Sequence, residues 1–123
     1  MPNSVLLNCN SYEKYPSSGK YTYLPDNLNG APLYANCTLG LGNTNPGVGV
    51  LQRALDTCYG YNLAQDSVYG AATQSAVRSV QSRLGVTQDG VYGPATGKRM
   101  SWPTFSLSGN VFLGCTTFPG AFS

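Results

Sequence analysis

Apolar residues recur at helical spacing through the middle of the chain and predict three helices. The spacing predicts a first helix over residues 46–59 and a second over residues 71–84. A third, shorter helix is expected from Pro94 to about Met100, because proline is well placed in a first helical turn. The positions expected at the centre of the resulting bundle are Leu51, Leu55, Val77, Val80, Leu84, Val91 and Met100.

Outside this segment the pattern is weaker, and most of the chain is predicted to be loop. Alternation over residues 20–24 predicts a short strand that ends at Pro25, and residues 111–113 predict a strand fragment. We therefore predict a mainly α protein, a small three-helix bundle with loop-rich extensions. The predicted organisation has three parts: an arm over residues 1–43, a helical domain over residues 44–101 and an uncharged tail over residues 102–123.

The arm is rich in tyrosine, and two interpretations of it remain open. Residues 1–45 hold five of the nine tyrosines of the chain. In one interpretation the arm simply packs on the helical domain and is tethered by a disulfide. In the other, Tyr21, Tyr23 and Tyr34 form a platform for sugars, because aromatic faces stack well on glycans.

One eight-residue motif occurs twice. The stretch from Asp66 to Thr73 recurs from Asp89 to Thr96, at an offset of 23 residues and with six of eight positions identical. Similarity at a fixed period marks a repeated supersecondary unit. The first residue of each copy is expected to cap a turn, and the fifth, a glycine, to supply a positive φ. Each copy therefore predicts a turn, a short extended piece, a glycine corner and a helix start.

Composition and charge exclude several classes of function. Only 10% of the residues are charged, against roughly a quarter in typical domains, and the net charge is +2. Because the few basic residues are scattered along the chain, no nucleic-acid partner is expected. No apolar run approaches the length of a membrane span, and the run over residues 2–7 is too short for a signal peptide.

The cysteine pattern predicts two disulfides in a secreted protein. The number of cysteines is even, no CxxC pair occurs and the chain has no histidine, so neither a metal site nor a cofactor is expected. Four cysteines allow three pairings. We expect Cys37–Cys58, which would tie the loop before the first helix to its end. Cys9–Cys115 would then join the two ends of the chain.

The residues do not form a convincing catalytic site. Without histidine, the usual Ser-His and Cys-His nucleophiles are excluded. A glycosidase needs two carboxylates that flank a sugar bond, and Asp66 and Asp89 are the only acids in equivalent positions. Their place in the repeat favours a structural, turn-capping role for both. We therefore expect no enzymatic activity.

The string over residues 48–55 and the two repeated corners resemble the peptidoglycan-binding domain family. The string over residues 48–55 is similar to the opening helix of that family, with its Val-x-x-Leu-Gln-x-x-Leu pattern, and both repeated corners match the corners of the family. The resemblance covers roughly residues 44–101. The flanks are similar in style to small secreted actinobacterial proteins that carry such a domain. Ser67 departs from the glycine usual in the family, so a less demanding turn is expected there.

The resemblance implies a non-catalytic module that binds cell-wall peptidoglycan. Such a site needs flat surfaces for sugars and donors for carboxylates. The candidates are the rings of Tyr69 and Tyr92, the cations Arg78, Arg83, Lys98 and Arg99, and the helix N-termini after Gly70 and Gly93. Each has a structural alternative: packing for the rings, backbone geometry for the glycines and a solvated face for the cations.

Two classes of function follow from these observations. The leading prediction is a secreted, cell-wall-associated protein that binds the glycan or the stem peptide of peptidoglycan. The alternative is an extracellular structural or interaction protein, such as an inhibitor, a phage component or a self-assembling subunit. The low charge and the Tyr-rich arm favour protein contacts, since tyrosine is enriched at interfaces.

Overall fold

A computed structural model describes residues 7–29 and 35–122 of the chain. The described part contains three helices, α1 (Pro46–Tyr59), α2 (Ala71–Leu84) and α3 (Pro94–Arg99), and a 3₁₀ turn, η1 (Pro119–Ala121). It also contains six strands: β1 (Leu7–Asn8), β2 (Ser11–Ser17), β3 (Lys20–Asp26), β4 (Cys37–Thr38), β5 (Ser101–Ser106) and β6 (Phe112–Thr117). Tyr34 and the run over residues 2–6 lie outside the described residues.

The flanks fold into a sheet, which corrects the prediction of a mainly α protein. In the described part, β2, β3, β5 and β6 form an antiparallel sheet in that order, and β1 pairs with β4 in parallel. The fold is therefore mixed α and β. The pattern missed the sheet because its strands come from opposite ends of the chain, with Lys20 beside Ser106 and Tyr21 beside Phe105.

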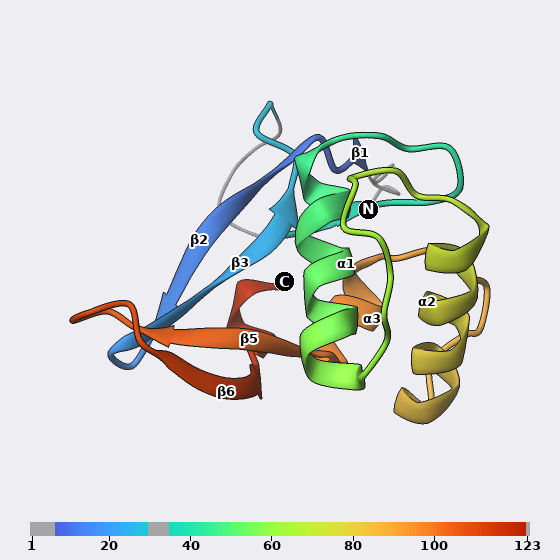
Figure 1. The fold of residues 1–123 in the computed structure, drawn as a ribbon. Helices are drawn as coiled ribbons and strands as arrows, with labels where there is room; N and C mark the ends of the chain where they lie inside the picture. The colour runs from blue at the N-terminus through green and yellow to red at the C-terminus, as the bar shows by residue number, and fades with distance from the viewer. Residues whose placement is uncertain (1–6, 30–34, 123) are drawn as a thin grey trace.

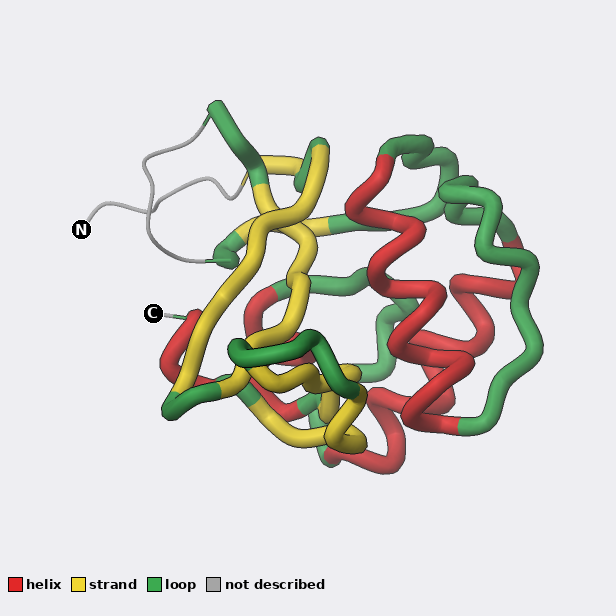
Figure 2. The backbone as a smooth tube through the Cα atoms, turned by 60° about the vertical axis from the view of Figure 1, so that its left-hand side comes forward, coloured by secondary structure: helices red, strands yellow, loops and turns green. Residues whose placement is uncertain are grey.

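Helix α1 is the central element. It lies between the four-stranded sheet on one side and α2 on the other, with α3 behind it (Figure 1). Figure 2 shows the longer helices on one side of the molecule and most of the strands on the other, where shorter helical segments also lie. The predicted bounds of α1 and α2 are confirmed, and α3 ends one residue before the predicted Met100. Local period and capping were enough for the helices, because Asn45 does cap α1 and Gly60 and Gly85 end the helices in the left-handed region.

The core lies where α1, the sheet and the corners before α2 and α3 meet. Most of the predicted centre is buried, but Leu84 is only half-buried and Val91 is 40% exposed, so its prediction as a core residue is wrong. Val91 points outward because the next residue, Tyr92, turns inward against Trp102. Strand β5, which contains Trp102, begins directly after α3 and replaces the loop predicted there.

Proline does not prevent β5 from joining the sheet. Pro103 has no N–H for the sheet, and its carbonyl accepts a hydrogen bond from the Thr22 hydroxyl at 2.5 Å. Thr22 is buried on the inner face of β3, beside the fully buried Leu24. A side chain therefore completes the junction between β3 and β5 where the backbone ladder stops.

The disulfide pairing differs from the one predicted. All four cysteines are oxidised, but the bonds are Cys9–Cys37 and Cys58–Cys115. Cys9 and Cys37 meet because β1 and β4 lie side by side, and Cys58 at the end of α1 meets Cys115 on β6. The first bond therefore follows the pairing of two strands, and the second follows the contact between α1 and β6. The predicted pairing was wrong because the sequence analysis placed both ends of the chain in loops.

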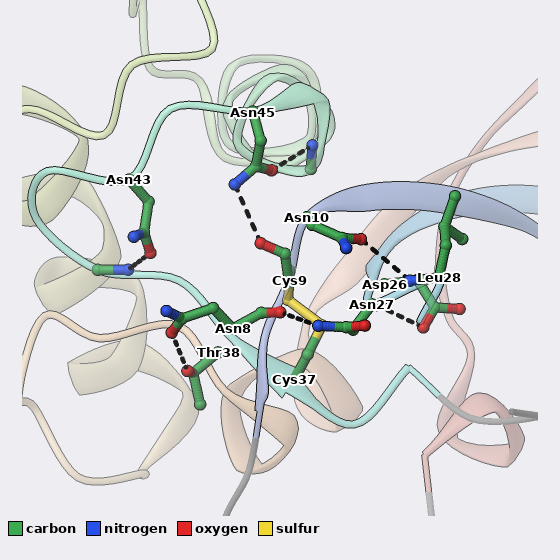
Figure 3. Close-up of a disulfide and its surroundings, with 12 residues drawn as sticks. Asn8, Cys9, Asn10, Asp26, Asn27, Leu28, Cys37, Thr38, Asn43 and Asn45 are labelled. Atoms are coloured by element: carbon green, nitrogen blue, oxygen red, sulfur yellow. Dashed lines mark hydrogen bonds between the residues drawn. A yellow bond between two sulfur atoms is a disulfide. The ribbon is translucent and has the colours of Figure 1, made fainter. Parts of the chain in front are cut away.

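Asparagine side chains form hydrogen bonds with the backbone around the first disulfide (Figure 3). Asn45 accepts from Gly47 N–H and donates to the Cys9 carbonyl, which joins the start of α1 to the bridge. Asn27 donates to the Asn8 carbonyl and Asn10 accepts from Leu28 N–H. The arm can thus be short of regular structure and still satisfy its backbone.

The two bridges differ in exposure, and this predicts the order in which they are reduced. Cys9 and Cys37 are each 1% exposed, whereas Cys115 lies at the surface. Because thiol–disulfide exchange requires access to a sulfur atom, mild dithiothreitol should open Cys58–Cys115 first. Alkylation followed by peptide mass mapping should label Cys58 and Cys115 at reductant levels that leave the other pair intact. Simultaneous labelling of all four would contradict this order.

Candidate functional site

Each corner is held by one buried glutamine from the preceding helix. Gln52 on α1 and Gln81 on α2 are both 1% exposed. The Gln52 amide nitrogen lies 3.3 Å from Asp66 Oδ1, 2.9 Å from the Val68 carbonyl and 3.1 Å from Thr73 Oγ1. Its oxygen accepts from Ser67 N–H at 3.0 Å.

Gln81 repeats this arrangement at the second corner. Its amide nitrogen lies 3.1 Å from Asp89 Oδ1, 2.9 Å from the Val91 carbonyl and 3.0 Å from Thr96 Oγ1. Its oxygen accepts from Gly90 N–H at 2.9 Å. The glutamines are 29 residues apart in sequence, whereas the motifs are 23 apart. The hydrogen-bonded unit at each corner therefore extends beyond the eight-residue motif to a glutamine on the preceding helix.

The two aspartates cap their turns. Asp66 Oδ1 accepts from Val68 N–H and Asp89 Oδ1 from Val91 N–H, each at 3.0 Å. The residue between lies in the left-handed region in both copies, with φ +64° for Ser67 and +71° for Gly90. The expectation of a less demanding turn at Ser67 is therefore wrong.

Gly70 and Gly93 do not supply the positive φ predicted for them. Both are extended, with φ −103° and −154°, and they cap the N-termini of α2 and α3. The positive φ lies three residues earlier in each copy, at the second position of the motif. A Cβ at Gly70 would meet open space, so neither strain nor crowding requires glycine there.

Tyr69 and Tyr92 are buried and cannot offer a ring face to a sugar. Tyr69 is 1% exposed, and its hydroxyl donates to the Gly90 carbonyl at 2.6 Å, which joins the first corner to the second. Tyr92 is 0% exposed, and its ring meets Trp102 edge to face. Burial raises the pKa of both hydroxyls. The predicted stacking role of these rings is therefore wrong in this fold.

The predicted cations are exposed but do not converge on one site. Arg78 lies beside Gly90 at the second corner, and Arg83 lies over the ring of Tyr59, with 5.2 Å from Cζ to the ring centroid. Lys98 and Arg99 are exposed in the last turn of α3. The structure does not bring any of these side chains together with the faces of Tyr69 or Tyr92.

Two surface grooves lie beside the corners. The second-corner groove, of about 220 Å³, is lined by Thr38, Val86, Thr87, Asp89, Val91, Gly93, Pro94, Ala95 and Thr96. The first-corner groove, of about 400 Å³, is lined by Tyr12, Tyr23, Pro46, Gly49, Val50, Arg53, Gln65 and Ser67. Of the site and turn residues predicted at the corners, Asp89 and Gly93 line the second-corner groove, and Tyr23 of the alternative sugar platform lines the first-corner groove.

The segment between β4 and α1 positions both grooves. Leu39 pairs with Tyr92 at the second corner, with N–H···O distances of 2.9 and 2.8 Å, and Tyr69 N–H donates to Asn43 at the first. Sequence reasoning missed Thr38, Tyr12 and Arg53 as groove residues. The tyrosine-rich arm was a signal for Tyr12, but only the fold brings that strand to the first corner.

Within residues 7–29 and 35–122, no group of three or more His, Cys, Asp or Glu side chains is placed to hold a metal ion. Over the same residues, no helix has the length and apolar character needed to cross a bilayer.

Comparison with known proteins finds a match to one family model and similarity to several solved structures. A family model described as a putative peptidoglycan binding domain matches residues 44–100, slightly less than half of the chain. No curated protein matches. A peptidoglycan-binding protein from Clostridioides difficile, solved with glutamine hydroxamate, is 30% identical over 69% of this chain and 53% of its own, with a TM-score of 0.52.

The second structure is a fused Zn-dependent amidase/peptidase/peptidoglycan-binding domain-containing protein from Clostridium acetobutylicum. It is 30% identical over 50% of this chain and 27% of its own, with a TM-score of 0.48. The present chain therefore spans 53% and 27% of the length of these two proteins. The first alignment is longer than the family match, so it also includes residues of the flanks.

Replacing a corner glutamine should destabilise the fold. Gln81→Met keeps the length of the side chain but leaves buried polar partners unpaired, so we expect a loss of about 2–4 kcal/mol in the free energy of unfolding. Urea denaturation of the oxidised protein measures it. The exposed Gln88→Met is the matched control and should change stability by less than about 0.5 kcal/mol. Equal stability of the two variants would show that the corner does not depend on Gln81.

The first corner should also lose stability in acid. The N–H of Val68, followed by the amide of Gln52, holds the pKa of Asp66 below its ordinary value of 3.8. The charged form therefore stabilises the fold above the ordinary pKa, and this contribution is lost as pH falls through the lowered value. Asp66→Asn should be less stable than the unmodified protein at pH 7, and urea denaturation should show the gap closing at low pH. A gap that does not depend on pH would contradict this.

Proposed function

We propose that this chain is a non-catalytic, extracellular protein that binds bacterial cell-wall peptidoglycan. One observation carries the proposal: the match to a peptidoglycan-binding family covers residues 44–100, and this segment contains both glutamine-held corners and nearly all of the second-corner groove. The segment over residues 44–101 would be the binding unit, with the flanks over residues 1–43 and 102–123 folded onto it.

The second-corner groove has chemistry that suits this ligand. Its walls are apolar at Val86, Val91 and Pro94, and Thr87 adds an exposed polar side chain. The Thr38 hydroxyl donates to Asn8, and the methyl group of Thr38 lies toward Gly93. Peptidoglycan offers acetamido methyl groups, amides and sugar hydroxyls. Threonine hydroxyls both donate and accept hydrogen bonds, and apolar walls with a few polar groups are typical of ligand sites.

The role of the two aspartates supports binding without turnover. Asp66 and Asp89 each use an oxygen to bond a backbone N–H and a buried glutamine, which assigns them to holding the corners. All four cysteines are in disulfides, which removes thiolate chemistry. Two disulfides also support an extracellular location, where such bonds persist.

Self-association is the second candidate, and one surface favours it. On the β5–β6 hairpin, Leu107, Val111, Phe112 and Leu113 are 47–59% exposed, and β6 is an edge strand of the sheet. Apolar edge strands are sites where a second chain can pair. Light scattering over a range of concentrations tests this. A mass that doubles with concentration and is restored to the monomer by Val111→Lys would favour it.

Co-sedimentation with purified, protein-free peptidoglycan tests the proposed function. The unmodified protein should pellet with the wall at moderate salt. Ala95→Trp places a bulky ring in the second-corner groove and should lower the bound fraction at least about tenfold, because a filled pocket leaves no room for the ligand. Ala72→Trp is the matched control, since Ala72 occupies the same position in the first copy of the motif and is exposed outside both grooves.

Each result has a defined meaning. Both variants should keep the thermal stability of the unmodified protein, because each replaces an exposed alanine in the first helical turn. No pelleting by the unmodified protein at any salt would overturn the proposed function. If the bound fraction falls equally in Ala95→Trp and Ala72→Trp, the second-corner groove is not the binding site. Wall binding by the unmodified protein would still stand.

A further inference from the structure

We infer that the first-corner groove binds a peptidoglycan segment that combines a sugar with a neighbouring carboxylate. The inference rests on the proposed function and assigns to it a second contact region. Two of the groove residues, Tyr12 and Tyr23, lie in strands β2 and β3, outside the segment that matches the family. The site would therefore be a product of this chain's own arm docking against the first corner.

The arm supplies a braced aromatic surface. Tyr12 is 42% exposed and meets Tyr23 edge to face, with 5.4 Å between ring centroids. Behind it, Tyr23 packs on Tyr21 at 5.6 Å and Tyr21 on Phe105 at 5.5 Å. This row of rings across the sheet fixes the Tyr12 ring, and an ordered ring loses little entropy when a ligand stacks on it.

Helix α1 supplies the charged group. Arg53 is exposed, and its Cζ lies 5.0 Å from the centroid of the Phe105 ring, which holds the guanidinium by a cation–π contact. It is the one charged residue among those that line the groove. A guanidinium pairs with a carboxylate through two parallel hydrogen bonds, so the groove favours an anionic ligand.

The floor of the groove is kept open by a glycine on the same face of α1. Pro46, Gly49, Val50 and Arg53 follow at helical spacing and all line the groove. A Cβ at Gly49 would lie 2.7 Å from Ser67 Oγ, so a larger residue would collide with Ser67 and reduce the space. Gly49 thus leaves room for the Ser67 side chain, whereas a Cβ at Gly70 would meet open space.

Ser67 and Gln65 add neutral polar groups beside this floor. Ser67 takes the left-handed conformation that glycine takes at the equivalent Gly90, and its side chain lines the groove. A side chain in that conformation is disfavoured, and such residues cluster where a site uses them. The Gln65 amide donates to Asp56 at 3.0 Å, which orients it.

The combination identifies the class of ligand. A neutral glycan would stack on Tyr12 and leave Arg53 without an anionic partner, and a free peptide would pair with Arg53 and leave the Tyr12 ring unused. A sugar with an attached acidic peptide, as in a disaccharide–peptide unit of peptidoglycan, would use both. The groove of about 400 Å³ is of the size that small-ligand sites have.

Titration of the isotopically labelled full chain with a soluble disaccharide–tripeptide fragment tests the inference by NMR. Amide signals of Gly49, Val50 and Ser67 should shift. Arg53→Gln should weaken the fragment at least about tenfold, because it removes the bidentate partner of the carboxylate. Arg83→Gln is the matched control: it removes the same charge from another cation that lies over a ring, and it should bind like the unmodified protein.

The aromatic contact is tested in the same titration. Tyr12→Ala should weaken binding and Tyr12→Phe should retain it, because the ring face is kept. A neutral N-acetylglucosamine tetramer should bind weakly, and Arg53→Gln should not change its affinity. All of these positions are exposed, so thermal unfolding should be unchanged in the variants.

The outcomes separate this inference from the proposed function. If the unmodified protein pellets with peptidoglycan but the fragment shifts no groove signal, the inference is wrong and wall binding stands. Equal affinity of Arg53→Gln and Arg83→Gln for the fragment would also overturn it. If groove amide signals shift with the fragment but the protein does not pellet with peptidoglycan, the groove assignment stands and the proposed wall binding is overturned. If the signals do not shift and the protein does not pellet, both the inference and the proposed function are wrong.

Discussion

A buried amide in each of the two long helices holds the corner that follows it. Gln52 and Gln81 each bring a side-chain amide, with the donors and acceptor of a peptide group, to a turn that has no sheet partner of its own for these backbone groups. Leaving such groups buried and unpaired would cost more than the corner gains by packing. The direction in which α2 and α3 leave their corners therefore depends on the two glutamines.

This arrangement limits where a ligand can bind. The tyrosines and threonines that define the motif are buried, and the exposed aspartates use an oxygen to hold the corners, so these residues build the scaffold. Ligand chemistry must come from the surfaces that the scaffold places next to each other. At the second corner these are threonine side chains and apolar walls, and at the first they are Arg53 and the rings of the arm.

The flanks complete the molecule with little charge and few regular elements. β3 and β5 join the two ends of the chain in one sheet that covers α1, and the Cys58–Cys115 bond ties that sheet to the end of the helix. Around Cys9–Cys37, asparagine side chains replace the backbone partners that longer strands would have provided. The docking of the arm also brings Tyr12 to the first corner. The packing that stabilises the flanks therefore also forms the first-corner groove.

Local pattern was enough to predict α1, α2 and the aspartate turn caps, because helical period, caps and Asx turns depend on neighbours within a few residues. It placed the positive φ of each corner at the wrong residue. It could not predict the sheet, because Lys20 and Ser106 are adjacent only in the folded chain. The disulfide pairing failed for the same reason. Only tertiary packing decided that Tyr69 and Tyr92 point inward, and that Tyr12 and Arg53, from separate segments, share one groove.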